Sequence, residues 1–98
     1  MRYKIISTEI FDKWFSRLKD AITKRKILAR LARVENGNFG DCKNIAGGLF
    51  ELRFFFGSGL RIYYAICDDQ VVILLVGGDK SSQNKDIEKA KQLINELE

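Results

Sequence analysis

The feature that most constrains the fold is a period of two residues in two neighbouring stretches of the chain. Large apolar residues occupy every second position from residue 50 to 54 and from residue 60 to 66, with Gly57-Ser58-Gly59 between the stretches. This period predicts strands with one buried face, and a short link that contains glycine is typical of a hairpin. The alternate positions share the other face, which is the candidate active surface. They are Glu51, Arg53 and Phe55 on the first strand, and Arg61 and Tyr63 on the second.

The N-terminal part of the chain predicts a short strand followed by two helices. Residues 3–6 alternate between apolar and polar positions, and a serine and a threonine after them can cap a helix. Residues 10–18 place their aromatic and aliphatic side chains on one stripe. A second helix is expected from about Asp20 to a stop at Asn36-Gly37. Its expected buried residues are Ala21, Ile22, Leu28, Leu31 and Val34.

The C-terminal part completes a mixed fold. Residues 36–48 are rich in glycine and asparagine and are expected to form a loop. The apolar run Val71–Val76 predicts a central strand, and apolar residues at helical spacing predict a final helix from about Asn84. The expected order is β-α-α-β-β-β-α in a single domain over residues 1–98. We therefore expect an α+β fold, in which a helical hairpin packs on a small antiparallel-dominated four-stranded sheet, with a C-terminal helix.

Composition excludes several classes of protein. With 98 residues, no proline and no Gly/Ser linker, the chain is expected to be one compact domain. Cys42 and Cys67 have no partner at metal-ligand spacing and no signal-like segment precedes them, so we expect free thiols, no metal site and a cytoplasmic location. The longest apolar run is too short to span a bilayer. Neither a membrane nor a small-molecule cofactor is expected.

Positive charge is concentrated in the first third of the chain. Residues 1–33 carry ten Lys and Arg against three Asp and Glu, whereas residues 34–98 carry seven against ten. A clustered positive field attracts RNA, DNA and acidic proteins alike, and a merely solvated helix face is the alternative interpretation. We expect the outward side of the second helix to form a basic ridge that binds RNA or the ribosome. Its members are Lys24, Arg25, Lys26 and Arg30, and Lys43 of the loop is a further candidate phosphate contact.

Four motifs follow one another along nearly the whole chain. They are Gly37-Asn38-Phe39-Gly40-Asp41, Glu51-Leu52-Arg53, Gly59-Leu60-Arg61-Ile62-Tyr63, and Gly77-Gly78-Asp79-Lys80 with Gln83, Asp86 and Ile87. Together they resemble the addiction-module killer branch of the RelE/HigB toxin superfamily. The resemblance implies a RelE-like fold and a type II toxin of bacterial or phage origin that halts translation, usually by cutting mRNA on the ribosome. It also implies a cognate antitoxin, in this branch a small helix-turn-helix protein like HigA.

Such toxins use a ribose 2′-hydroxyl to attack the adjacent phosphodiester, which requires a base, cations for the phosphate oxygens and an acid for the departing oxygen. Because the chain contains no histidine, these roles must fall on other residues. Glu51 is the candidate base. Arg53 and Arg61 are assigned to the phosphate, since a planar guanidinium holds two oxygens at once. The resemblance adds Lys80 as a cation for the leaving oxygen, with glycines 77 and 78 admitting the RNA backbone.

Each of these residues also has a structural alternative. A Glu51–Arg53 pair is common on the exposed face of a sheet, and arginines protect open sheets from aggregation. Lys80 can be an ordinary loop lysine. Tyr63 can stack on a base, donate a proton or simply pack in the sheet. The chain lacks the C-terminal aromatic or histidine of many ribonuclease members, so the identity of the general acid is open.

Three classes of function follow from these observations. The leading hypothesis is a metal-independent, ribosome-dependent mRNA endoribonuclease. The second is a non-catalytic toxin that poisons DNA gyrase, as relatives on the same fold do. The third is a basic interaction module whose only role is to hold its repressor partner. The fold alone does not separate them.

Overall fold

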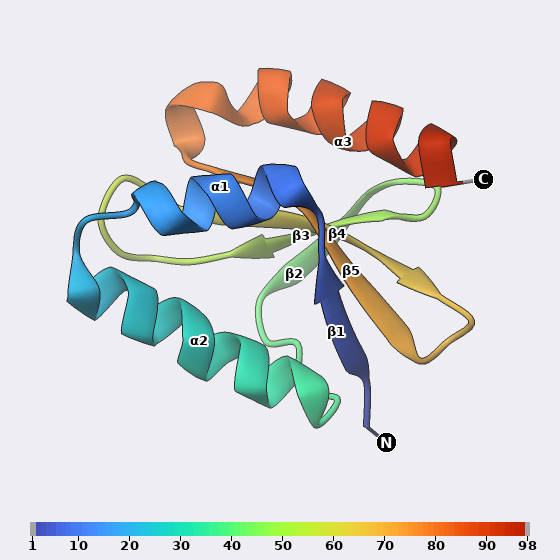
Figure 1. The fold of residues 1–98 in the computed structure, drawn as a ribbon, viewed down its shortest axis with the longest axis horizontal. Coiled ribbons are helices and arrows are strands. Elements are labelled where there is room, and N and C mark those ends of the chain that lie inside the picture. Colours follow the sequence, from blue (N-terminus) through green and yellow to red (C-terminus); the bar gives the residue numbers. More distant parts are fainter. Residues whose placement is uncertain (1, 98) are drawn as a thin grey trace.

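The computed structural model describes residues 2–97, in which one five-stranded sheet is flanked by three α-helices (Figure 1). The elements are β1 (Lys4–Ser7), α1 (Glu9–Arg17), α2 (Ala21–Glu35), β2 (Cys42–Ala46), β3 (Leu49–Arg53), β4 (Arg61–Cys67), β5 (Val71–Gly78), a 3₁₀ turn η1 (Lys80–Ser82) and α3 (Gln83–Leu97). The strands lie in the order β1-β5-β4-β3-β2. Only the pairing of β1 with β5 is parallel within the described residues. The predicted α+β class and its mainly antiparallel sheet are confirmed.

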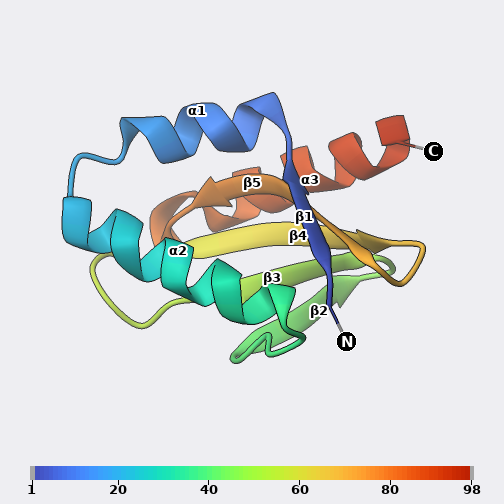
Figure 2. The same cartoon turned by 60° about the horizontal axis from the view of Figure 1, so that its bottom comes forward.

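The two faces of the sheet are covered by different helices. Figure 2 shows α2 in front of the sheet, α1 above it and α3 behind it. The core beneath α1 and α2 joins Phe11, Ile27 and Val34 to the strand residues Leu52, Ile62 and Tyr64. A second core beneath α3 joins Ala90 to strand residues of the other face, among them Tyr63 and Leu75. The strands β3 and β4 are therefore covered on both faces of the sheet, whereas their period of two predicted one buried face.

The predicted ends of the first two helices are confirmed by their capping contacts. The hydroxyl of Thr8 accepts a hydrogen bond from the backbone N–H of Phe11 at 3.0 Å, which caps α1. The carboxylate of Asp20 accepts one from the N–H of Ile22 at 3.0 Å, which caps α2. After α2 the chain turns at Gly37, whose φ of 89° is favourable only for glycine.

The sheet has one strand more than the sequence predicts. Residues 36–48 were expected to form a loop, but Cys42–Ala46 forms β2 and pairs antiparallel with β3. Four of its five residues are exposed, because β2 lies at the edge of the sheet. An exposed edge strand carries no alternation of buried side chains, and its backbone pairing alone defines it. The prediction of four strands is therefore wrong.

The buried stripe of α2 also differs from the prediction. Ile22 and Leu28 were expected to be buried, yet they are 60% and 55% exposed. Ile27, Arg30 and Val34 occupy the buried positions instead. These three lie three and four residues apart and so form one stripe, and Leu28 lies about 100° around the helix from Ile27. An arginine occupies the middle of the stripe, so the apolar residues alone predict the wrong phase.

None of the helices in residues 2–97 combines the length and the apolar character needed to cross a membrane.

Candidate functional site

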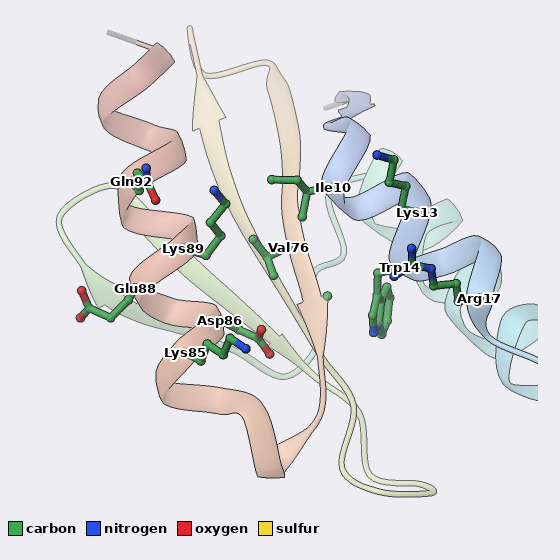
Figure 3. A pocket seen from close by; sticks show the side chains of 11 residues that line it. Ile10, Lys13, Trp14, Arg17, Val76, Lys85, Asp86, Glu88, Lys89 and Gln92 are labelled. Carbon is green, nitrogen blue, oxygen red and sulfur yellow. The ribbon is translucent and has the colours of Figure 1, made fainter.

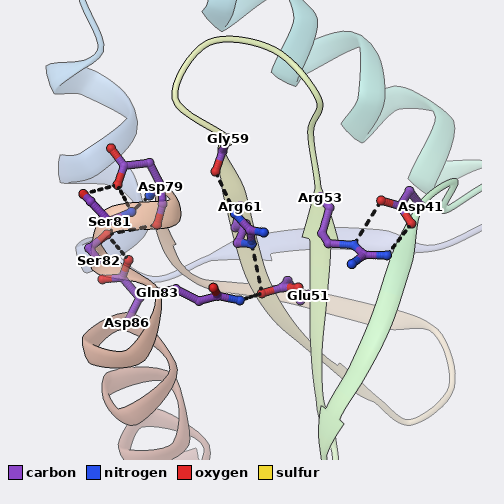
Figure 4. Close-up of polar contacts among 10 residues, drawn as sticks. All are labelled: Asp41, Glu51, Arg53, Gly59, Arg61, Asp79, Ser81, Ser82, Gln83 and Asp86. Carbon is purple, nitrogen blue, oxygen red and sulfur yellow. Dashed lines mark hydrogen bonds and ion pairs between the residues drawn. The ribbon is translucent and has the colours of Figure 1, made fainter.

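The register of β3 and β4 brings the predicted polar residues together on one face. Arg53 lies directly opposite Arg61, and Glu51 lies directly opposite Tyr63. Residues opposite each other in an antiparallel pair point to the same side of the sheet. On β2, Lys43 lies opposite Glu51 and so continues that row. The prediction that both arginines share a face with Glu51 is confirmed (Figure 4).

The candidate active surface is not accessible at Glu51. This residue is only 1% exposed, because the start of α3 lies over it. The Gln83 side-chain amide donates a hydrogen bond to Glu51 Oε2 at 3.0 Å, and Arg61 Nε lies 3.4 Å from the same oxygen (Figure 4). Glu51 is thus a buried carboxylate held between a helix residue and an arginine. A base must come within about 3 Å of the proton that it removes, so this burial weighs against the predicted base role.

Tyr63 and Arg61 complete this buried cluster. Tyr63 is fully buried, and its hydroxyl has no hydrogen-bond partner among residues 2–97. Burial raises the pKa of Tyr63 above its ordinary value of 10.0, and the negative charge of Glu51 adds to the shift. Arg61 donates from Nη1 to the carbonyl of Gly59 at 3.0 Å. As it lies, Tyr63 presents no ring on which a base could stack.

Arg53 is paired with an acid that the sequence analysis did not single out. Its Nε and Nη2 donate to the two carboxylate oxygens of Asp41, each at 3.0 Å. Hydrogen bonding to Asp41 raises the pKa of Arg53, and the negative charge of that acid adds to the effect. Both partners are about one-third exposed, with side-chain exposures of 36% and 32%. Asp41 therefore occupies the fork of the guanidinium that was assigned to phosphate, at a position open to solvent.

Arg30 does not lie on the basic ridge, although it was predicted there. It is 8% exposed and points inward from α2. Its guanidinium donates to three backbone carbonyls, those of Phe39 at 3.0 Å, Arg53 at 2.9 Å and Asp41 at 2.8 Å. The group also lies 5.0 Å from the centre of the Phe54 ring. Arg30 thus fastens α2 to the loop before β2 and to the end of β3, and it is not on the outward surface.

The other ridge residues remain accessible. Arg25 and Lys26 are exposed, and Lys24 is half-buried with Nζ 5.6 Å from the centre of the Phe15 ring. Lys26 Nζ lies 4.6 Å from the centre of the Phe56 ring, in the link between β3 and β4. The ridge is therefore reduced to these three cations, which lie on the side of the sheet opposite α3. Lys43 is exposed on β2.

Lys80 lies beside the turn that precedes Arg61. It is exposed, and its backbone N–H donates to the carbonyl of Ser58 at 3.4 Å. A methyl group at Gly59 would lie 3.5 Å from both Lys80 Cβ and Arg61 Nη1, so these two cations flank the same glycine. The side chain of Asp79 caps η1 by accepting from the N–H of Ser81 at 2.9 Å (Figure 4). The structure thus places the stem of Lys80 at Gly59, next to Arg61.

The glycines before Lys80 do not leave room for an RNA backbone, as the sequence analysis expected. A side chain at Gly77 would overlap the ring of Trp14, and one at Gly78 would overlap the carboxylate of Asp86. Both glycines are buried and allow these neighbours to pack on β5.

Residues 13–96 match the family described as phage-derived protein Gp49-like. An uncharacterized protein of Haemophilus influenzae is 50% identical over 97 residues, which cover 99% of this chain and 98% of that protein.

The chain belongs to the Gp49-like family of phage-derived proteins.

Solved structures show which fold this Gp49-like chain has. The free state of an Escherichia coli RelE toxin mutant matches with a TM-score of 0.77 and 18% identity, over 96% of this chain and 99% of that one. The toxin–antitoxin complex RelBE2 of Mycobacterium tuberculosis matches with a TM-score of 0.64 and 18% identity, over 82% of this chain and 100% of that one. The predicted RelE-like fold is confirmed.

Two contacts of this Gp49-like site were missed from sequence. Asp41 and Gln83 both lie in the quoted motifs, but no role was assigned to them. Asp41 precedes an unrecognised strand, and Gln83 begins α3, so only the tertiary fold shows that they meet Arg53 and Glu51.

A groove of about 700 Å³ lies between α1 and α3 (Figure 3). Ile10, Trp14 and Val76 form its apolar floor, and of the sequence-predicted site residues only Gly77 lines it. Asp86 reaches this groove and accepts a hydrogen bond from the Ser82 hydroxyl at 2.6 Å. Burial raises the pKa of Asp86, and that hydrogen bond opposes the shift.

In residues 2–97, no cluster of three potential metal ligands is present.

Proposed function

We propose that this chain is the toxin of a type II toxin–antitoxin system and that it cleaves mRNA on the ribosome. The observation that carries the proposal is the pair of arginines directly opposite each other on β3 and β4, with Lys80 beside them. Each arginine is paired with a carboxylate side chain, Asp41 or Glu51. Carboxylate and phosphate present similar oxygens to a guanidinium, so an RNA phosphate can replace the exposed Asp41 at Arg53.

The proposed reaction is attack of a 2′-oxygen on the adjacent phosphorus. The 2′-O–P bond forms and the bond to the 5′-oxygen breaks, which leaves a cyclic phosphate and a 5′-hydroxyl. Arg53 and Arg61 would stabilise the charge on the phosphate oxygens, and Lys80 would stabilise the departing oxygen. We assign Glu51 to holding the guanidinium of Arg61 in place, since both lie in the buried cluster. The 2′-hydroxyl proton then goes to another exposed group, for which Lys43 in its uncharged form is the candidate, and the departing 5′-oxygen takes a proton from the charged Lys80 or from water.

The proposal includes partners and a location. The solved RelBE2 structure is a toxin–antitoxin complex, and this similarity in fold supports a cognate antitoxin here. We propose a helix-turn-helix protein like HigA as that antitoxin, on the resemblance of the four motifs. Ribosome and mRNA are the proposed targets, which places the activity in the cytoplasm. The reaction as written needs no cofactor.

The test is mRNA cleavage in a translation reaction with purified ribosomes, scored at the ribosomal A site. Arg53→Ala should lower the cleavage rate about 100-fold, because one charged donor to the transition state is lost. Arg53→Lys should recover only part of the rate, since an ammonium does not reproduce the planar fork. Asp41→Ala is the matched control, because it breaks the same ion pair but leaves the guanidinium in place.

The expected result is that Asp41→Ala keeps at least the wild-type rate. An equal loss in Arg53→Ala and Asp41→Ala would show that the ion pair is structural and would contradict the proposal. Supercoiling by DNA gyrase is the parallel assay. Inhibition of gyrase without cleavage of mRNA would favour the non-catalytic alternative.

A further inference from the structure

Three phenylalanines follow one another after β3, and the middle one is left in solvent. Phe54 is 6% exposed and lies against Arg30, and its ring meets Phe56 with centroids 5.8 Å apart. Phe56 is half-buried and is covered by Lys26. Phe55 is 84% exposed. Exposing a phenylalanine forgoes the stabilisation that its burial would bring, and it leaves the ring accessible to a ligand.

The position of Phe55 relates it to the cations of the site. The N–H of Phe54 donates to the carbonyl of Leu60 at 3.0 Å, which extends the antiparallel pairing of β3 and β4 by one step. Phe54 packs on the side of α2, so the alternation of an extended chain places Phe55 on the opposite side, the side of Arg53 and Arg61. Lys80 flanks Gly59 in the same link. The exposed aromatic ring is thus expected on the side of the sheet that carries Arg53, Arg61 and Lys80.

We infer that Phe55 is a stacking platform for an unpaired nucleobase of single-stranded RNA, next to the phosphate that Arg53 and Arg61 hold. The inference rests on the proposed function and adds a base contact to it. Single-stranded RNA is bound by the combination found here, in which cations track the backbone and an aromatic ring stacks on a base. Every base has a π-face, so this platform favours an unpaired base and carries little sequence preference.

Charge favours RNA over a protein partner at this ring. An apolar protein contact would be expected to surround Phe55 with further exposed apolar residues. The other exposed large apolar residues are Ile6, Ile22, Leu28 and Leu97, which lie in β1, α2 and α3 rather than in this link. Arg53 and Arg61 are each paired with one acid, whereas Lys80 forms no ion pair within residues 2–97, so this face still has a cation available for a phosphate.

The experiment measures binding of the full chain to short single-stranded RNA by fluorescence anisotropy. All riboses of the RNA carry 2′-O-methyl groups, so the attacking hydroxyl is blocked and no cleavage occurs. Phe55→Leu should weaken binding about tenfold, and Phe55→Trp should retain it, because only the latter keeps an aromatic face. Leu97→Ala is the matched control at an exposed apolar residue of α3, 54% exposed, and should bind like the wild type.

Two further readouts separate stacking from charge. The dependence of affinity on salt should be unchanged in Phe55→Leu, because stacking releases no counterions, whereas Lys80→Ala should reduce the salt slope. An abasic nucleotide is then moved along the RNA one position at a time. When the abasic nucleotide lies at the base that stacks on Phe55, the affinity of the wild type for RNA should fall about tenfold. The affinity of Phe55→Leu should not fall further, because this variant already lacks the stacking contact.

Each other outcome overturns the stacking site. Binding by Phe55→Leu equal to wild type excludes it, as does an equal loss at the abasic position in both proteins. Weaker antitoxin binding with unchanged RNA binding would assign Phe55 to the protein partner instead. If the wild type binds no RNA, the stacking site is overturned, and the ribosomal cleavage assay decides separately whether the proposed function survives.

Discussion

The two faces of the sheet use arginine in different ways. On the side of α1 and α2, Arg30 donates to three backbone carbonyls, which cannot leave the site. On the other side, Arg53 and Arg61 pair with the side-chain carboxylates of Asp41 and Glu51. Asp41 is about one-third exposed, so it can rotate away from Arg53 and be replaced by a phosphate, whereas a main-chain carbonyl cannot. Glu51 is buried and holds Arg61, which also donates to the carbonyl of Gly59. An accessible side-chain acceptor therefore distinguishes Arg53, which can bind a ligand, from Arg30, which holds the fold.

The largest effect on stability is expected at Arg30. In Arg30→Ala the carbonyls of Phe39, Asp41 and Arg53 lose a charged donor, and that of Asp41 keeps the N–H of Arg53 as its donor. Each hydrogen bond to a charged group is worth about 1.5–3 kcal/mol. We expect the free energy of unfolding, measured in urea, to fall by about 4 kcal/mol. Arg30→Lys should not restore it, because one ammonium cannot reach all three carbonyls. Arg33→Ala, an exposed neighbour on α2, is the control, and an equal effect in both would contradict the distinction.

The next effect concerns the buried ion pair on the other face. Arg61→Ala leaves Glu51, 1% exposed, with Gln83 as its remaining donor, and breaking a buried pair costs about 3 kcal/mol. Replacing both residues, as Arg61→Ala with Glu51→Gln, removes the uncompensated charge and should recover much of that loss. Urea unfolding of the two single variants and the double variant gives the coupling directly. If the losses of unfolding free energy in the two single variants simply add up in the double variant, Arg61 does not compensate the buried charge of Glu51.

The sequence predicts the parts of this site that local patterns control. The alternation in residues 50–66 correctly places Arg53 opposite Arg61, because strand register and the short link determine which residues face each other. The burial of Glu51 depends on α3, which packs on this face from about thirty residues further along the chain. The inward position of Arg30 depends on carbonyls from the loop before β2 and from β3. No local pattern contains these contacts.

A third prediction compares the neighbouring tyrosines of β4, which point to opposite faces. Burial raises the pKa of both Tyr63 and Tyr64 above the ordinary value of 10.0, so each is neutral in the folded chain at a pH where it ionises in the unfolded chain. Their contribution to stability is therefore present below pH 10 and is lost as the pH rises above it. At pH 11, Tyr63→Phe or Tyr64→Phe should each retain about 1 kcal/mol that the wild type loses.

The two tyrosines should differ in their response to Glu51→Gln. The charge of Glu51 contributes to the raised pKa of Tyr63, whereas Tyr64 lies in the core of the other face. Removing that charge should make Tyr63 ionise at lower pH and leave Tyr64 unchanged. Tyrosinate absorbance, recorded in each Tyr→Phe background, distinguishes the two residues. An equal fall in the pKa of Tyr63 and of Tyr64 after Glu51→Gln would show that the charge of Glu51 acts on both faces of the sheet.

The smallest effect on stability is expected for the three cations that remain on the basic ridge. Lys24, Arg25 and Lys26 form no ion pair with any acid in residues 2–97, and Arg25 and Lys26 are exposed. Reversing the charge of Arg25 and Lys26 together should change the free energy of unfolding by less than about 1 kcal/mol, because surface substitutions away from packed contacts have small effects.

If the ridge binds ribosomal RNA, the same double reversal should weaken ribosome binding and flatten its dependence on salt, since fewer counterions are released. An unchanged salt slope would show that the ridge is only a solvated helix face. Phosphate binding would then be confined to Arg53 and Arg61, which pair with side-chain acids.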